Sequence, residues 1–180
     1  MNFACGRPQR GQPVVSPAPC GATPNAEPSM RSVLTSRGRS GVPPRPKAHL
    51  VDTNIILRYL VGDTPAQAGK SAALMERLEE GAERAEILES VIAEAVWTLE
   101  SFYKVPRPEI AERLAAIVAF RGVLAAKKGV LIKALARFGS TSADFVDCLL
   151  AAQAQQRNQT VYSFDAKDFR RLGIAWEGPA

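Results

Sequence analysis

The chain has 180 residues, of which 46% are hydrophobic and 23% are charged, and this is the composition of one ordinary globular domain. No apolar run approaches the roughly 18 residues of a membrane-spanning helix, and we expect neither a secretory signal nor a membrane partner. The net charge of +5 is uneven, because residues 1–47 hold seven Lys or Arg and one acid, while the remainder carries −1. Cys148 is the single cysteine of that remainder, which favours a reducing, cytoplasmic location.

Residues 1–47 are predicted to be a disordered tail. They hold nine of the 13 prolines and five glycines, and they show no apolar periodicity. Such a segment cannot bury enough apolar surface to offset the entropy that it would lose on ordering. The alternative is a start codon downstream, for example at Met30, which would make part of the tail an artefact of translation. The predicted domain covers residues 48–180.

Strand-like and helix-like segments alternate along residues 48–180. Residues 49–51 predict a short buried strand, and residues 55–60 predict a helix directly after it. Pro65 suits the first turn of the second helix and Gly81 suits its end. The other predicted segments are helices at 65–81, 91–103, 108–120, 127–138 and 142–157, and strands at 86–90, 122–126, 160–164 and 174–176. This alternation predicts an α/β protein, a three-layer α/β/α sandwich around a mostly parallel sheet of four to five strands.

Four carboxylates stand in surroundings that are unusual for solvated acids. Asp52 and Asp165 each follow a predicted strand, and the crevices of parallel α/β sheets open at such strand ends. Glu94 and Asp147 lie inside apolar helical runs, where an unpaired charge is costly to desolvate. Acids that converge on one crevice repel one another, and a divalent cation resolves that repulsion. Oxygen ligands without His or Cys favour Mg²⁺, with Mn²⁺ as the alternative, over Zn²⁺.

Each acid also has an ordinary structural explanation. Asp52 and Asp165 could cap the helices that follow them, and Asp144 fits a capping box at the start of the helix 142–157. Glu94 and Asp147 would belong to buried salt bridges. Four separate coincidences are less expected than one shared site, so we predict that the four acids act together.

The segments around these acids resemble the four motifs of PIN-domain ribonucleases. They read Leu50-Val-Asp52-Thr-Asn-Ile-Ile-Leu57, Val91-Ile-Ala-Glu94-Ala-Val-Trp97, Asp144-Phe-Val-Asp147-Cys-Leu-Leu-Ala-Ala152 and Ser163-Phe-Asp165-Ala-Lys-Asp-Phe169. Their order also fits, as do the separations of 42, 53 and 18 residues between the acids. The resemblance covers about residues 48–175. Residues 82–90 are more charged than the usual second strand of the family, and the tail lies outside the family pattern.

The resemblance implies a metal-dependent endoribonuclease that hydrolyses RNA phosphodiester bonds. Small single-domain members of this kind are mostly VapC-type toxins of type II toxin–antitoxin systems. The implied partners are therefore RNA, a cognate antitoxin protein and a second copy of the chain. Apolar stripes along the helices 65–81 and 108–120 are expected to face a partner.

The resemblance also implies roles for individual residues. The positions that match the acids of the family's site, as metal ligands and catalytic groups, are Asp52, Glu94, Asp147 and Asp165. Asp144 matches a more variable position and is an additional metal-ligand candidate. Thr53, Asn54 and Ser163 are predicted to orient the carboxylates through hydrogen bonds.

Two rival functions are open from the sequence. A catalytically silent domain of PIN shape would bind RNA or protein without cleaving it, and the presence of all four acids argues against it. A flavodoxin-like regulatory domain also uses an acidic pocket at strand ends. It needs a Lys at the end of a late strand, and residues 161–165 supply none.

Overall fold

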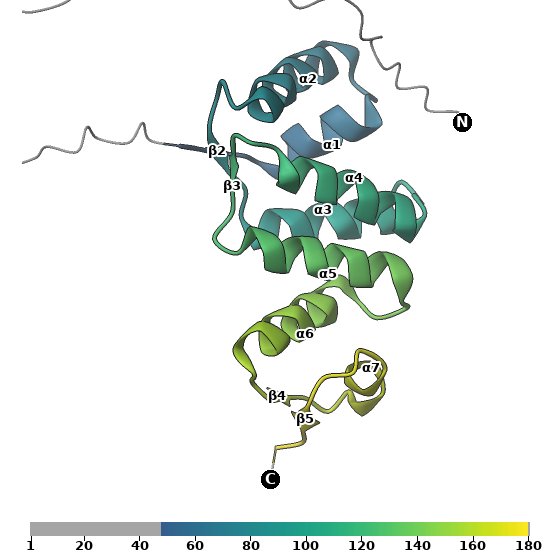
Figure 1. Ribbon diagram of the computed structural model, residues 1–180. Coiled ribbons are helices and arrows are strands. Elements are labelled where there is room, and N and C mark those ends of the chain that lie inside the picture. The colour runs from purple at the N-terminus through teal and green to yellow at the C-terminus, as the bar shows by residue number, and fades with distance from the viewer. Residues whose placement is uncertain (1–47, 180) are drawn as a thin grey trace, which may run out of the picture. The chain divides into compact units, whose positions relative to one another are not determined.

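The computed structural model describes residues 48–179, so the predicted tail at 1–47 lies outside the described part of the chain. Short strands and longer helices alternate along residues 48–179 (Figure 1). The strands are β1 (His49–Leu50), β2 (Ala85–Glu86), β3 (Val123–Leu124), β4 (Val161–Tyr162) and β5 (Trp176–Glu177). The helices are α1 (Thr53–Val61), α2 (Pro65–Glu80), α3 (Glu89–Ser101), α4 (Arg107–Ala119), α5 (Lys128–Ser140), α6 (Phe145–Arg157) and α7 (Ala166–Arg171). No helix within this part is long and apolar enough to cross a membrane.

Within residues 48–179 every strand pairing is parallel, and the five strands form two separate ladders. β2 lies between β1 and β3, with Leu50 opposite Glu86, and β4 pairs with β5. The predicted α/β class with parallel strands is confirmed, with the strands divided three and two. The predicted strand at 86–90 is wrong over its second half, because α3 already begins at Glu89.

The three-stranded ladder is buried on one face. Its Val51, Ala85, Ile87 and Val123 are at most 5% exposed. Neighbours in register share a face of a sheet, and alternate residues along a strand face opposite sides. Leu50 therefore points to the other face, where 67% of it is exposed. In Figure 1 this ladder lies at the margin of the helices, and β4 and β5 lie beyond α6.

The helices supply most of the core. α5 packs against α4 on one side and α6 on the other (Figure 1), and Leu131 and Leu135 of α5 are fully buried. The apolar stripes of α2 and α4 are covered by the chain itself, since Leu78 and Leu114 are also fully buried. The prediction that these two stripes face a partner is therefore wrong.

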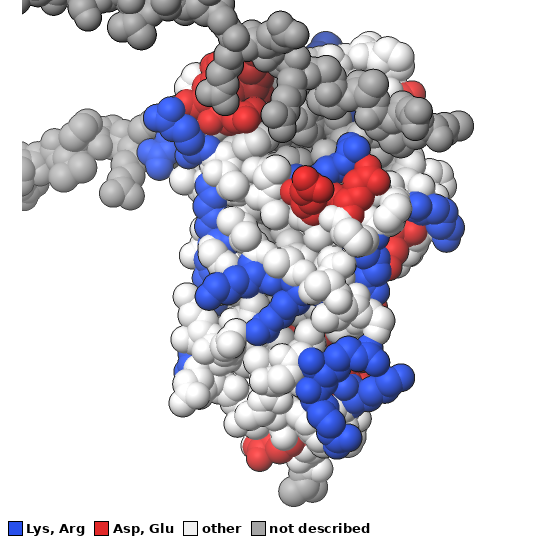
Figure 2. Space-filling view, turned by 45° about the vertical axis from the view of Figure 1, so that its right-hand side comes forward, with Lys and Arg blue, Asp and Glu red and all other residues white. Residues whose placement is uncertain are grey.

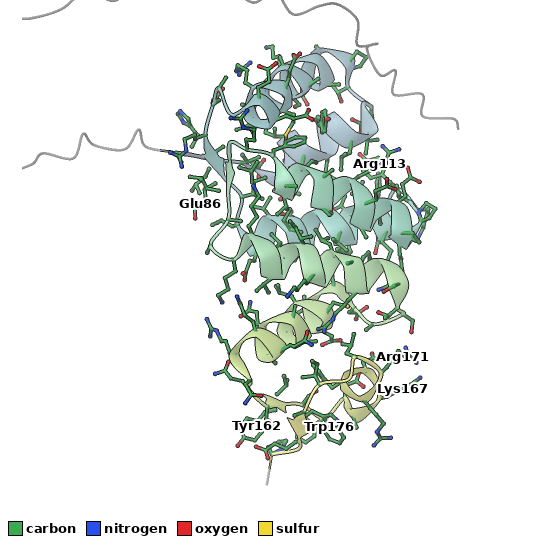
Figure 3. All side chains as sticks on the ribbon, viewed as in Figure 1. Glu86, Arg113, Tyr162, Lys167, Arg171 and Trp176 are labelled. Atoms are coloured by element: carbon green, nitrogen blue, oxygen red, sulfur yellow. The ribbon has the colours of Figure 1, made fainter. Side chains whose placement is uncertain are left out.

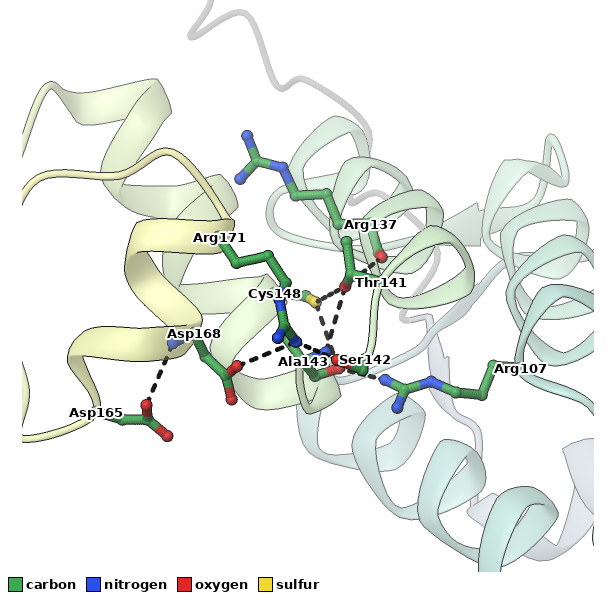
Figure 4. A network of polar contacts seen from close by, with 9 residues as sticks. All are labelled: Arg107, Arg137, Thr141, Ser142, Ala143, Cys148, Asp165, Asp168 and Arg171. Atoms are coloured by element: carbon green, nitrogen blue, oxygen red, sulfur yellow. Dashed lines mark hydrogen bonds and ion pairs between the residues drawn. The ribbon is translucent and has the colours of Figure 1, made fainter.

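The connection between α5 and α6 is fixed by polar contacts, which Figure 4 shows, and by aromatic contacts. The Arg107 guanidinium lies 4.0 Å from the ring centroid of Phe138 and donates a hydrogen bond to the carbonyl of Ala143. Phe138 and Phe145 meet edge to face, with ring centroids 6.1 Å apart. Arg171 of α7 donates to the Ser142 hydroxyl in the same connection. These contacts hold α6 and the elements after it against α5.

Candidate active site

Asp52 and Glu94 lie in one polar cluster at the carboxyl end of β1. Asp52 occupies the N-cap position of α1, but its side chain makes no capping hydrogen bond and instead accepts one from Asn54 Nδ2 at 3.2 Å. Thr53 Oγ1 donates to Glu94 Oε2 at 2.6 Å, and Thr53 is only 3% exposed. The buried hydroxyl of Thr53, the residue that follows Asp52, thus holds the Glu94 carboxylate of α3 at this end of β1.

Asp147 lies in a second cluster, formed by the first turns of α6 and α7. Partial burial raises the pKa of Asp147, and repulsion from Asp144, Asp165 and Asp168 raises it further. Asp168 is an acid that the sequence reasoning did not select. Its signal was the spacing of three residues from Asp165, which places both at the start of one short helix.

The ordinary roles proposed for these acids hold only in part. Asp165 does cap α7, because its carboxylate accepts a hydrogen bond from the backbone N–H of Asp168 at 3.2 Å. Asp144 makes no side-chain cap of α6. Within residues 48–179, neither Glu94 nor Asp147 forms a salt bridge. Burial in ion pairs therefore does not explain the two acids that lie within helices.

Ser163 acts on the backbone rather than on a carboxylate. Its hydroxyl accepts a hydrogen bond from the backbone N–H of Asp165 at 2.9 Å. This contact shapes the turn from β4 into α7, which presents Asp165 beside the start of α6. Asp168 is in turn 3.5 Å from the guanidinium of Arg171 (Figure 4).

The helices that carry Glu94 and Asp147 touch each other through Gln153 of α6. Gln153 Nε2 donates to Glu89 Oε2 of α3 at 3.3 Å, and its Oε1 accepts from Lys127 Nζ at 3.1 Å. Yet no group of three or more His, Cys, Asp or Glu in the described part of the chain is close enough to hold a metal ion. The carboxylate oxygens are the type of ligand that Mg²⁺ prefers.

Basic side chains border the second acidic cluster. α7 contributes Lys167, Arg170 and Arg171, and a basic patch covers this end of the described part in Figure 2. Lys167 and Arg170 are exposed, whereas the Arg171 guanidinium turns toward the Ser142 hydroxyl and Asp168, and Figure 3 shows Lys167 and Arg171 on α7. The exposed cations beside these acids give this surface a positive region that attracts anions.

Comparison with known proteins supports the motif analysis. No curated protein matches the sequence. The family model of the PIN domain matches residues 49–175, which is well over half of the chain and includes all four predicted acids. With the parallel α/β fold and an acid at each motif position, this match shows that the chain belongs to the PIN domain family.

Proposed function

We propose that this protein is a metal-dependent endoribonuclease that hydrolyses RNA phosphodiester bonds. The observation that carries the proposal is the family match over residues 49–175, with an acid at each of the four motif positions. PIN domains are generally Mg²⁺-dependent nucleases. The proposed site acids are Asp52, Glu94, Asp147 and Asp165, with Asp144 as an additional ligand. The basic patch of α7 beside Asp165 favours a phosphate-rich substrate.

Mg²⁺ is the proposed cofactor, with Mn²⁺ as a substitute. The donors are carboxylates without His or Cys, which is the ligand set of hard divalent cations. The repulsion that raises the pKa of Asp147 is of the kind that a bound cation relieves. The pair Asp52 and Glu94 must meet the pair Asp147 and Asp165 before the four can share an ion.

We further propose that the protein is the toxin of a type II toxin–antitoxin system. The proposed inhibitor is an antitoxin protein that places a basic side chain among the acids around Asp147. Expression of the wild-type chain in bacteria should then slow growth, while the Asp52→Asn variant should be tolerated. Equal toxicity of the two forms would contradict the nuclease explanation.

A second candidate function is a silent domain that binds RNA without cleaving it. The separation of the two acidic clusters favours it, since no three acids of the described residues meet at one point. The two functions differ in whether RNA is consumed, so one cleavage assay separates them.

The assay follows a mixed RNA pool with the full chain in Mg²⁺ and in EDTA. The nuclease proposal expects fragments only with the metal, and loss of cleavage by at least about 100-fold in Asp147→Asn, as removal of a ligand to a catalytic metal does. Glu79→Gln is the matched control, because Glu79 is an exposed acid of α2. Binding without fragments in Mg²⁺ or Mn²⁺ would overturn the proposal in favour of the silent domain.

A further inference from the structure

Arg84 and Arg121 lie side by side at the amino ends of β2 and β3. The N–H of Ala85, the residue after Arg84, donates to the carbonyl of Gly122 at 3.0 Å. Gly122 is in turn the residue after Arg121. A Cβ at Gly81 would lie 3.7 Å from Arg121 Nε, so this side chain runs along the end of α2. Both arginines are exposed, and they place two guanidinium groups at this end of the ladder.

Two lysines continue the positive charge along β3. Lys127 and Lys128 stand at the start of α5, three and four residues after β3 ends. Lys128 Nζ donates to the carbonyl of Phe120 at 2.6 Å, and Phe120 is the residue before Arg121. Lys127 Nζ donates to Gln153 Oε1 at 3.1 Å. We define the β3 stripe as the four cations Arg84, Arg121, Lys127 and Lys128.

The β3 stripe has no carboxylate partner of its own. None of its four cations forms a salt bridge within residues 48–179, and the acceptors of its lysines are a neutral amide and backbone carbonyls. Among the acids of the segment 82–90, Glu83 binds Arg77 at 2.8 Å. Glu89 accepts a hydrogen bond from Gln153 at 3.3 Å. Glu86 of β2 is the remaining acid of that segment, so the stripe keeps an excess of positive charge.

A row of cations without carboxylate partners suits a row of phosphates. β3 is the outer strand of its ladder, because it pairs only with β2. In Figure 2, Lys and Arg side chains follow one another down the left-hand side of the described part, and β2 and β3 lie at that side in Figure 1. Cations that neutralise phosphates release counterions from a nucleic acid, which gives affinity without reading its sequence. The structural alternative is that these charges only keep the edge of β3 from pairing with other strands.

We propose that the β3 stripe binds the sugar–phosphate backbone of RNA away from the bond that is cleaved. Its arginines stand at the amino ends of β2 and β3, whereas Asp52 follows the carboxyl end of β1, and β2 lies between β1 and β3. The stripe therefore adds affinity for the strand and takes no part in the chemistry. The proposal rests on the proposed function for RNA as the substrate, but its main test needs no cleavage.

Fluorescence anisotropy in EDTA measures the binding of a labelled oligouridylate to the full chain without cleavage. The double variant Arg84→Gln, Arg121→Gln should bind at least about tenfold more weakly at about 50 mM salt. The slope of log affinity against log salt should also flatten by about 1.4, which is about 0.7 for each lost phosphate contact. Lys128 is left in place, because its ammonium group also holds backbone carbonyls.

Two further variants separate the stripe from net charge. Lys70→Gln with Arg113→Gln is the matched control, which removes the same charge from α2 and α4 and should leave most of the affinity. Figure 3 shows Arg113 on the side of the molecule opposite to Glu86. Glu86→Gln removes the acid beside the stripe and should strengthen binding by about two- to threefold. An equal loss in the two double variants would overturn the proposal, because net charge alone would then explain it.

Cleavage kinetics in Mg²⁺ separate this proposal from the nuclease proposal. In Arg84→Gln, Arg121→Gln the KM for RNA should rise while kcat stays unchanged, because the stripe does not touch the reacting phosphate. Wild-type affinity and salt dependence in a variant that aggregates would show that the stripe only protects the edge of β3, and would overturn the proposal while the nuclease function stands. The expected loss of binding in a chain whose wild type cleaves no RNA would support the stripe and overturn the nuclease function.

Discussion

Asp147 is a carboxylate whose ionisation the folded chain opposes, through partial burial and through repulsion from Asp144, Asp165 and Asp168. Its pKa is raised in the folded state, so folding favours the protonated form. The charge therefore destabilises the fold progressively as the pH rises from the unfolded pKa through the folded one. We expect Asp147→Asn to keep or raise the metal-free stability at neutral pH, by up to about 1 kcal/mol.

Thermal unfolding in EDTA measures this effect when it is repeated at a low pH, at which the carboxylate is protonated in both the folded and the unfolded state, and at neutral pH. The gain of Asp147→Asn over wild type should be larger at the higher pH. The control Glu79→Gln should shift little at either pH. A variant less stable than wild type at both pH values would show that the Asp147 carboxylate makes a stabilising contact.

Single residues could be predicted where their partners are close in sequence or fixed by a motif. Asn54 reaches Asp52 two residues away, and Thr53 reaches Glu94, as the motif resemblance implies. Asp168 was missed because its approach to Asp147 depends on how α7 packs beside α6. A helix of six residues is too short for the spacing of its apolar residues to indicate how it packs.

At the scale of elements, Gly122 is the described glycine at which an added Cβ would meet the rest of the chain most closely. Its N–H donates to the Leu78 carbonyl at 2.7 Å, and an added Cβ would lie 2.0 Å from the carbonyl oxygen of Glu83. Both partners are backbone and cannot move aside. Gly122→Ala should therefore destabilise the protein by more than about 3 kcal/mol.

Gly129→Ala is the matched substitution. Gly129 lies in α5 with nothing within 4 Å of an added Cβ, and alanine favours a helix over glycine, so a gain of about 0.5 kcal/mol is expected. Urea unfolding monitored by circular dichroism compares the two variants. Equal stability of the two would mean that the segment at Gly122 can open at little cost.

Helices were easier to predict than strands. Pro65 begins α2 and Gly81 ends it in the left-handed conformation with φ 77°, as the residue types alone indicate. Each strand has two residues, so its alternation is too short to read, and the charged segment 82–90 hid the start of α3. The division into two ladders depends on contacts between distant segments, which local patterns do not encode.

At the scale of the whole molecule, the tail is the part whose role the sequence predicts most simply. Its composition predicts that a chain starting near Lys47 folds and cleaves RNA with unchanged kcat. Loss of the +6 charge of residues 1–47 should weaken RNA binding and flatten its dependence on salt. RNA affinity and cleavage at two salt concentrations measure this. A shortened chain that fails to fold would show that the tail packs against the domain.

The assembly of the site was the least predictable level. The sequence identifies four acids in the right order, but whether they meet depends on where α6 sits. Phe145 and Cys148 pack α6 against α5, and in the sequence they look like ordinary core residues. No pattern in the sequence shows whether α6 and the elements after it pack against the sheet of their own chain.

Because β1 is short, its unpaired edge offers few backbone groups for pairing with another strand. The strand ends at Leu50, and α1 starts at Thr53. Amyloid growth needs six or seven residues that stack in register without proline. Concentrated solutions of this protein should therefore resist fibril formation even though an apolar edge is open to water.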